Sequence, residues 1–317
     1  MPLILRLLLL LALAAASQTA NAACSAAASV MADIGAHTSY DVRAGGVPAV
    51  AAPATLNCSG SLLSLVATDY ARATTTSANG FQLRSATGEA IAYQLSADPA
   101  ASHPLTQGGT INFLDPTLLG LLGILNGPRF TPTIYARLAD RPNVQAGTYT
   151  DLVTVRWSWA ICRGVGLGGL CILQERGSGA TTLTVSVTVA KDCRINAPAV
   201  SFGAAPLASH FPAVTQAVAV DCTKGASFAV AFSAGGGVAT RPWRGMKGPA
   251  GHVLRYNLYR PDGVTIWDES NPLTLTNAGT GATTPTLTQT YVARVDPDQP
   301  TPPAGSYSDT VSVVVSF

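Results

Sequence analysis

Charged side chains are scarce in this sequence. Asp, Glu, Lys and Arg make up 11% of its 317 residues, against about 25% in an average soluble domain. The lysines number only three, no run of basic residues occurs, and the formal net charge is +2. Nucleic acids and anionic membranes attract proteins through clustered positive charge, so we expect neither as a partner. The composition also argues against a coiled coil and against charge-rich disorder.

Recognisable catalytic motifs are also missing. The four histidines show no recurring spacing with a nucleophile or with metal ligands. Neither a G-x-S-x-G elbow nor a zinc-protease helix motif is present. A glycine-rich stretch at 164–169 resembles a phosphate-binding loop, but no helical pattern follows it. We therefore expect a protein that is not an enzyme and that holds no cofactor and no metal ion.

The longest apolar run lies at the N-terminus and has the form of a secretory signal. Arg6 precedes the apolar segment 7–16, and Ala20-Asn21-Ala22 fits a small-x-small cleavage site. The run is too short to span a bilayer. We expect residues 1–22 to be a signal peptide. In the alternative reading Cys24 is lipidated, but a lipoprotein site usually has leucine three positions earlier, where this chain has Asn21.

A repeated segment divides the remaining chain into two copies that differ by one strand. Residues 147–155, Gly-Thr-Tyr-Thr-Asp-Leu-Val-Thr-Val, are echoed by residues 305–313, Gly-Ser-Tyr-Ser-Asp-Thr-Val-Ser-Val. After the first copy the chain makes a hairpin and another strand at 182–189, whereas the second copy ends at Phe317. An exported domain without its last strand should accept one from a partner. The predicted acceptor edge consists of Tyr307, Val311, Val313, Val315 and Phe317.

Alternation of apolar and polar residues predicts an all-β protein. The runs are separated by Gly, Pro, Asn and Asp, and a 3.6-residue period is not evident after the signal. Two immunoglobulin-like β-sandwich domains in tandem are expected, at 23–190 and 191–317, with the second lacking its last strand. The expected strands lie near 54–57, 62–67, 81–84, 90–95, 110–114, 133–138 and 148–159 in copy one, and near 217–221, 227–233, 254–259, 264–267, 273–276, 290–295 and 307–317 in copy two.

The sequence has six cysteines, an even number that allows all of them to form disulfide bonds in an oxidising compartment. Six cysteines allow fifteen pairings, but the repeat narrows them, because matching positions in the two copies suggest matching bonds. A zinc site is the alternative, yet the short ligand spacings that it needs do not occur. The predicted disulfides are Cys24–Cys58, Cys162–Cys171 and Cys193–Cys222.

Several motifs of the second copy fall in the order found in one known family, and copy two resembles the spore coat protein U domain over nearly all of 191–317. Copy one resembles it more loosely, over 24–160. The motifs are Cys193-Arg-Ile195, Val200-Ser-Phe-Gly203, Val220-Asp-Cys222-Thr, Leu254-Arg-Tyr-Asn-Leu-Tyr259, Trp267 and Gly305-Ser-Tyr-Ser-Asp-Thr-Val311.

This domain is the subunit fold of archaic, Csu-type chaperone–usher pili, and a two-domain member resembles the tip adhesin of such pili. The resemblance implies donor-strand complementation, with a periplasmic chaperone, an outer-membrane usher and a neighbouring subunit that donates its N-terminal strand as partners. It also implies export through the periplasm to the pilus tip on the cell surface. The expected start at Ala23-Cys24 leaves no donor segment, which fits one end of a fibre.

Two apolar loops are the candidates for contact with an abiotic or host surface. The connection 115–128 is rich in large aliphatics, while the corresponding connection 276–285 in copy two has none. Strand counting places this loop and the hairpin 162–171 at the pole of the first domain far from the second. The alternative reading is a short helix that packs into the core. The predicted contacts are Leu118, Leu119, Leu121, Leu122, Ile124, Leu125, Val165, Leu167 and Leu170.

Two rival functions remain open from the sequence. A carbohydrate-specific lectin would need a platform such as Trp157 and Trp159, which share a sheet face, although core packing also explains them. A structural coat subunit would need a donor segment. We interpret Asp151 and Asp309, which recur in both copies, as residues that satisfy free backbone amides near a strand start. Arg137 and Arg294 are candidate partners for them.

Overall fold

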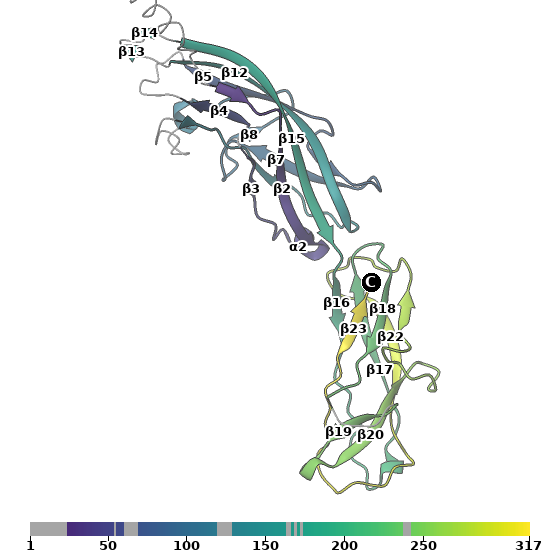
Figure 1. Cartoon of the computed structure of the whole chain (residues 1–317). Coiled ribbons are helices and arrows are strands. Elements are labelled where there is room, and N and C mark those ends of the chain that lie inside the picture. The colour runs from purple at the N-terminus through teal and green to yellow at the C-terminus, as the bar shows by residue number, and fades with distance from the viewer. Residues whose placement is uncertain are drawn as a thin grey trace, which may run out of the picture.

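The computed structural model describes residues 24–53, 55–59, 69–118, 129–162, 166–167, 170–171, 174–236 and 242–317. Strands dominate these residues and gather into two bodies that lie end to end (Figure 1). Buried apolar side chains form two separate clusters, one from Cys24 to Val189 and one from Ala208 to Val295. The predicted all-β fold of two tandem sandwiches is thereby confirmed. No helix in these ranges is long and apolar enough to cross a membrane.

The first domain is built around one large sheet with the strand order β2-β15-β12-β6-β7-β11-β3. Strand β5 also pairs with β12 and with β9, and β1, β4 and β10 form a small second sheet. The strands are β1 (Cys24–Ala26), β2 (Ser29–Thr38), β3 (Val50–Ala51), β4 (Leu56–Ser59), β5 (Tyr70–Ser77), β6 (Gln82–Arg84), β7 (Ala90–Ser96), β8 (Pro104–Leu105), β9 (Thr110–Asn112), β10 (Arg129–Phe130), β11 (Tyr135–Leu138), β12 (Gly147–Cys162), β13 (Gly166–Leu167), β14 (Leu170–Cys171) and β15 (Gln174–Ala190).

Strand β15 completes the first domain from within. It pairs with β12 antiparallel from Gly147↔Val189 to Cys162↔Gln174, and with β2 parallel from Thr182↔Ser29 to Ala190↔Thr38. β15 therefore lies between β12 and β2. Its alternating aliphatics face the core, and Leu183, Val185, Val187 and Val189 are at most 2% exposed. The domain thus carries the strand that the second copy lacks.

A short helix, α2 (Ser39–Ala44), follows β2 at the end of the first domain that faces the second (Figure 1). It begins at Thr38, whose hydroxyl accepts a hydrogen bond from the backbone N–H of Asp41, while the Asp41 carboxylate accepts one from the N–H of Thr38. It ends at Gly45, whose left-handed φ of 76° suits a residue without a Cβ. These caps satisfy the free backbone groups of a helix too short to be stable alone.

The second domain consists of two facing sheets with the strand orders β16-β17-β22-β20-β19 and β21-β18-β23. Their inward side chains, including Trp267 and Phe232, form the second core. The strands are β16 (Cys193–Asn196), β17 (Val214–Cys222), β18 (Phe228–Phe232), β19 (Arg244–Lys247), β20 (Val253–Tyr259), β21 (Leu273–Leu275), β22 (Leu287–Val295) and β23 (Val313–Ser316), with 3-10 helices η1 (Ala208–His210) and η2 (Pro249–Gly251).

All three predicted disulfides are confirmed: Cys24–Cys58, Cys162–Cys171 and Cys193–Cys222. The first joins β1 to β4 and the third joins β16 to β17, each at a directly opposed pair of residues. The second closes the hairpin between β12 and β14 at the far end of the first domain. The equivalent positions of the first and third bonds explain why the repeat predicted them.

Candidate functional site

An open groove runs along the last strand of the second domain. β23 pairs with β18 on one side, and no strand in the described ranges pairs with its other edge. A hollow of about 350 Å³ lies there. One wall is the segment 197–202, which follows the opening strand β16, and the other is the segment 307–313. These are the counterparts of the two walls that hold β15 in the first domain.

Comparison of the two copies shows what the missing strand does to burial. Three residues of β12 that point into the core beside β15 are 0% exposed, and the same positions in the second copy are only half-buried. The hydropathy of the two segments is alike, so the difference comes from the absence of a covering strand. The buried residues are Tyr149, Val153 and Val155, and their half-buried counterparts are Tyr307, Val311 and Val313.

A second hollow of about 630 Å³ continues the groove toward the pole of the second domain that is distant from the first. The two hollows share Val200, Phe202, Met246 and Tyr307 in their linings. Of the predicted acceptor residues, Tyr307, Val311, Val313 and Val315 are packed partly buried against the core. Phe317 departs from this set: its side chain is 58% exposed, and its ring lies 5.1 Å from the ammonium nitrogen of Lys191.

The repeated aspartates satisfy backbone amides, as the sequence predicts. The Asp151 carboxylate accepts from the backbone N–H groups of Asn79 and Leu152, and from the Tyr93 hydroxyl at 2.6 Å. In the same way, the Asp309 carboxylate accepts from the N–H groups of Gly236 and Thr310 and from the Tyr256 hydroxyl at 2.7 Å. Burial, together with the hydrogen bond to Asp309, raises the pKa of Tyr256, so this phenol remains a donor at neutral pH.

The suggested arginine partners for these aspartates were wrong. Arg137 donates through Nε and Nη2 to the side chain of Gln94, its cross-strand neighbour. Arg294 lies over the ring of Tyr259 at 4.6 Å. Both arginines sit on the outward faces of their strands, where a cross-strand amide or a ring is within reach and a buried carboxylate is not.

The far pole of the first domain holds the disulfide-closed hairpin, as strand counting predicts. β12 runs from Gly147, beside the end of β15 that leads into the second domain, to Cys162 at the opposite end. Strands β13 and β14 extend beyond it (Figure 1). Leu167 and Leu170 are paired there in the backbone register. Their side chains, and all of Val165, lie outside the described residues.

The prediction of Leu118 as a surface contact was wrong. Its side chain is 1% exposed and belongs to the core cluster of the first domain. It lies in the helical residues 116–118, which follow β9 and Phe113. The Phe113 ring packs on Trp157 at 5.3 Å, so the chain is still against the core at this point. The other candidates in this loop, Leu119, Leu121, Leu122, Ile124 and Leu125, lie outside the described residues.

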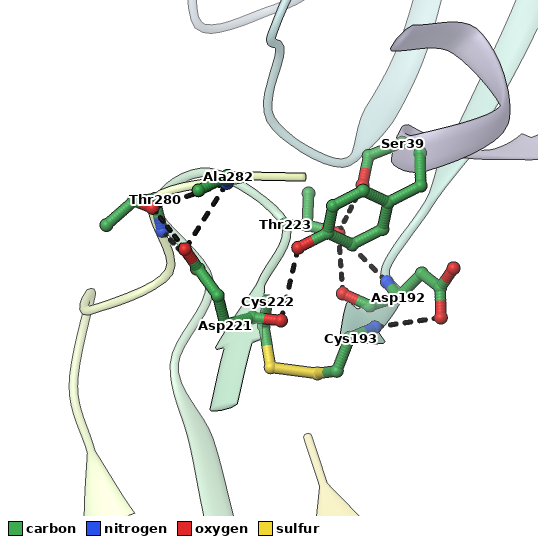
Figure 2. The surroundings of a disulfide bond; sticks show 9 residues. Ser39, Asp192, Cys193, Asp221, Cys222, Thr223, Thr280 and Ala282 are labelled. Atoms are coloured by element: carbon green, nitrogen blue, oxygen red, sulfur yellow. Dashed lines mark hydrogen bonds between the residues drawn. A yellow bond between two sulfur atoms is a disulfide. The ribbon is translucent and has the colours of Figure 1, made fainter. Parts of the chain in front are cut away.

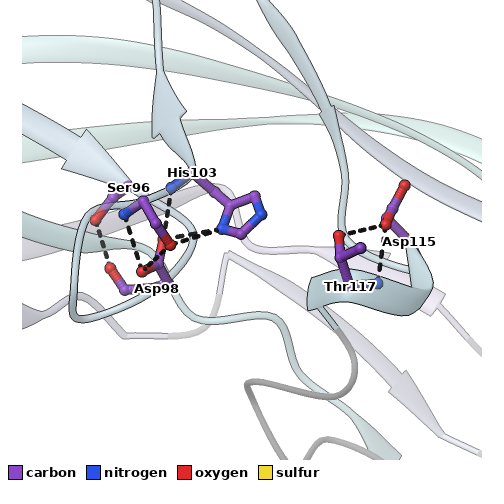
Figure 3. A network of polar contacts seen from close by, with 6 residues as sticks. Ser96, Asp98, His103, Asp115 and Thr117 are labelled. Carbon is purple, nitrogen blue, oxygen red and sulfur yellow. Dashed lines mark hydrogen bonds and ion pairs between the residues drawn. The ribbon is translucent and has the colours of Figure 1, made fainter.

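A polar network that sequence analysis missed fixes the segments beside this loop (Figure 3). The Asp98 carboxylate accepts from the backbone N–H of His103 at 2.7 Å, from the N–H and hydroxyl of Ser102, and contacts His103 Nδ1 at 3.3 Å. Nearby, the Asp115 carboxylate accepts from the N–H and hydroxyl of Thr117. Only the closeness of Asp, Ser and His in sequence hinted at this arrangement. It holds the loop before β8 and the turn that begins the 115–128 connection.

These contacts lower the pKa of the Asp98 carboxylate. Burial alone would raise its pKa, but hydrogen bonds from Ser102 and His103 outweigh burial and hold the pKa below its usual value. A carboxylate with a depressed folded pKa adds stability that is complete above its unfolded pKa of about 3.9. That stability is lost as the pH falls through the folded value.

We expect Asp98→Asn to destabilise the first domain by about 1–3 kcal/mol at pH 7, because an amide cannot accept from all of these donors. Chemical denaturation of residues 24–190 measures the loss. The difference from wild type should be constant between pH 5 and 8 and shrink below about pH 4, as the wild-type carboxylate becomes neutral first in the unfolded and then in the folded state. A difference that stays the same at acid pH would contradict the assignment. Asp33→Asn on β2 is the comparison variant, and we expect a smaller loss there, because its exposed carboxylate accepts only from the N–H of Gly35 and the hydroxyl of Ser186.

The tryptophans do not form a carbohydrate platform. Trp157 and Trp159 are 2% and 6% exposed. Trp159 lies across β15 where Gly177 leaves room, since a Cβ there would come within 2.4 Å of the indole ring. Core packing, the alternative reading, is therefore confirmed for both. Among the described residues, no group of three or more His, Cys, Asp or Glu side chains is placed to hold a metal ion.

The chain is similar in structure to proteins of bacterial pili. The chain is similar to one chain in a crystal structure of the CsuC–CsuE chaperone–tip adhesion subunit pre-assembly complex from archaic chaperone-usher Csu pili of Acinetobacter baumannii. The match covers 93% of this chain and 100% of that chain, with 22% identity and a TM-score of 0.66. A weaker likeness, with a TM-score of 0.30, 11% identity and coverage of 84% of this chain and 85% of that one, is to the CupB6 tip adhesin from Pseudomonas aeruginosa. No curated protein matches the sequence.

The family comparison agrees with the repeat found in the sequence. The model of the Spore Coat Protein U domain matches residues 10–156 and again residues 180–314. Each match contains one of the two copies of the Gly-x-Tyr-x-Asp segment, and together they account for most of the chain. The chain therefore belongs to the Spore Coat Protein U domain family, of which it carries two domains in tandem.

Proposed function

We propose that this protein is a pilus tip adhesin whose second domain takes up a β-strand from a neighbouring subunit, while its first domain meets the target surface. One observation carries the proposal. The face of residues 307–313 is half-buried above a hollow, whereas the same face of copy one is covered by β15. A strand edge with unpaired backbone groups and apolar pockets is the kind of site that strand addition fills.

The direction of the donated strand follows from the ends of the groove. β23 runs toward the first domain, because Phe317 lies beside Lys191 in the connection between the domains. A donor antiparallel to β23, as β15 is to β12, would begin at the connection and leave at the free pole. The donating subunit then has room at that pole. A parallel donor would leave where the first domain already lies.

The partners of the proposed adhesin follow from the same groove. Half-exposed apolar residues such as Val311 need cover before assembly, which a periplasmic chaperone would supply with a strand of its own. The similar structure from Acinetobacter baumannii is that of a chaperone–tip adhesion subunit complex, which supports this part of the proposal. An outer-membrane usher and an adjacent subunit complete the set, and the adhesin reaches the cell surface through the periplasm.

Attachment is assigned to the apolar loops of the first domain. The segment 119–125 contributes Leu119, Leu121, Leu122, Ile124 and Leu125, and the hairpin contributes Val165, Leu167 and Leu170. β9 runs toward the far pole before Phe113, since Asn112 pairs with Arg72 and Arg72 with Ser158 near the end of β12. Burial of apolar area is non-directional, so such loops would bind abiotic or host surfaces and promote biofilm formation.

We expect residues 191–317 expressed alone to lack a cooperative unfolding transition, because their groove stays open. Residues 24–190, which contain β15, should unfold cooperatively as a monomer and are the matched control. Thermal melts followed by circular dichroism and analytical ultracentrifugation measure both. A stable, cooperatively unfolding monomer of 191–317 would overturn the proposal.

A further inference from the structure

The connection between the domains is short and is enclosed by contacts from both sides. β15 ends at Ala190 and β16 begins at Cys193. Domains joined by so few residues can still pivot unless other contacts hold them. Here three separate segments of the first domain touch the second: α2, the residue Glu89 before β7, and Asn143 before β12.

The centre of these contacts is the hydroxyl of Thr223, which is 0% exposed (Figure 2). It lies 2.7 Å from the hydroxyl of Ser39 on α2. It accepts from the backbone N–H of Asp192 in the connection at 2.9 Å and lies 3.2 Å from the carbonyl oxygen of the same residue. A hydroxyl has one hydrogen and two lone pairs, so these three partners use its full capacity. One side chain, placed directly after the end of β17, thus ties the helix of the first domain and the connection to the second domain.

The surrounding contacts fix the same orientation. The Tyr40 hydroxyl donates to the carbonyl oxygen of Asp221 at 3.1 Å, and the guanidinium of Arg194 lies 4.8 Å from the Tyr40 ring centre. Burial, with the charges of Asp221 and Asp192, raises the pKa of Tyr40 to about 12, so it remains a donor at neutral pH. Tyr40 and Ser39 are 3% and 5% exposed.

A turn of the second domain receives two further contacts. The carbonyl oxygen of Gly281 accepts from Arg43 on α2, and that of Thr280 accepts from the Asn143 amide at 2.8 Å. The Asp221 carboxylate, 0% exposed, holds this turn through the N–H of Thr280 at 2.8 Å. Lys224 pairs with Glu89 at 2.6 Å, but this pair is partly exposed and contributes less.

We infer that Thr223 is the hub of a locked joint that holds the two domains in one orientation, so that the protein works as a single stiff rod. A pivot about residues 190–193 would break the contacts of Ser39, Tyr40, Arg43 and Asn143 together. Several of these are buried, and leaving a buried polar group without its partner is costly. The joint would keep the far pole of the first domain directed along the axis of the second.

The test measures the spread of distances between the domains by pulsed electron paramagnetic resonance. Spin labels are placed through non-canonical residues at the exposed positions Thr150 and Thr290, because all six cysteines are in disulfides. The full chain is used, purified with its periplasmic partner so that the second domain is folded. A variant with Gly-Ser-Gly-Ser inserted between Ala190 and Lys191 gives the distribution of a free joint.

We expect one narrow distribution for wild type and a broad one for Thr223→Val, close to that of the insertion variant. The exposed Thr215→Val on the same domain should stay narrow. Should Thr223→Val fail to fold, the pair Ser39→Ala and Tyr40→Phe loosens the joint from the first domain and leaves the Asp192–Thr223 contacts intact. A wild-type distribution as broad as that of the insertion variant would overturn the inference. So would narrow distributions in every joint variant.

Discussion

A copy of residues 177–190 added after Phe317 through a two-residue turn should give the second domain a cooperative transition at high temperature. The added strand would lie antiparallel to β23, with the copies of Leu183, Val185 and Val187 opposite Val311, Asp309 and Tyr307, as in copy one. Fully burying each aliphatic is worth about 1.5–3 kcal/mol, which suggests roughly 5 kcal/mol in total. For a domain of this size that corresponds to a rise of about 15–30 °C in Tm.

The control for this experiment carries Leu183→Ser, Val185→Ser and Val187→Ser in the added copy only. It has the same length and the same backbone, so it tests whether the inward side chains fill the groove. Differential scanning calorimetry of the full chain separates the transition of the second domain from that of the first. If the serine copy stabilises as well as the original, the groove does not take up alternating aliphatics in this register.

Replacing Leu119, Leu121, Leu122, Ile124 and Leu125 with Ser or Asn should abolish attachment while pili still assemble. One buried aliphatic is worth about 1.5–3 kcal/mol, so losing several contacts should lower adhesion at least about tenfold. Adhesion of the wild type should survive high salt, because little charge takes part. Attachment to polystyrene and the number of pili on the cell are measured separately.

Leu118→Ser is the contrasting variant for the same loop. Its side chain is 1% exposed in the core, so we expect a destabilised first domain and few pili rather than a selective loss of attachment. If the five replacements leave both assembly and attachment unchanged, the loop has no part in binding. If they reduce the number of pili as Leu118→Ser does, the segment belongs to the core.

The alternation of apolar and polar residues along the sequence was enough to predict strands whose inward residues are large. β12, β15 and β22 combine Val, Leu or Tyr on one face with Thr on the other, and the sequence predicted all three. β5 was missed because its inward residues are Ala71, Ala73, Thr75 and Ser77, which give no hydropathy contrast. β2 was missed because it has apolar residues on both faces, with Met31 56% exposed.

One expected strand does not form, because hydrogen bonds within a turn take its place. The segment near 264–267 forms only a single bridge, between Tyr259 and Ile266. The Asp262 carboxylate accepts from the N–H groups of Val264 and Thr265, which removes those donors from any sheet. The apolar residue at the end of this apolar–polar alternation is Trp267, whose ring is buried although the segment is not a strand. Its Nε1 donates to the carbonyl oxygen of Val230.

The candidate site was predictable where it depended on the repeat, and unpredictable where it depended on distant contacts. The repeat marked the acceptor edge, because in copy one the strand at 182–189 lies beside the segment equivalent to 307–317. The joint could not be foreseen, since Ser39 and Thr223 are 184 residues apart and the motif that contains Thr223 does not indicate a partner for its hydroxyl. The burial of Leu118 depends likewise on how the chain leaves β9, which hydropathy alone does not report.

Hydrogen exchange along β23 tests the central claim most directly. The carbonyl oxygens of Ser312 and Thr310 accept from the N–H groups of Ser233 and Gly236, in the segment that follows β18. The alternate residues Val311, Val313 and Val315 therefore direct their backbone groups toward the groove. In the chain with the added strand, the N–H groups of Val311 and Val313 should exchange as slowly as those of Ser312 and Val314. Without it they should exchange much faster than these neighbours. Fast exchange at Val311 and Val313 in the folded, extended chain would contradict strand uptake at this edge.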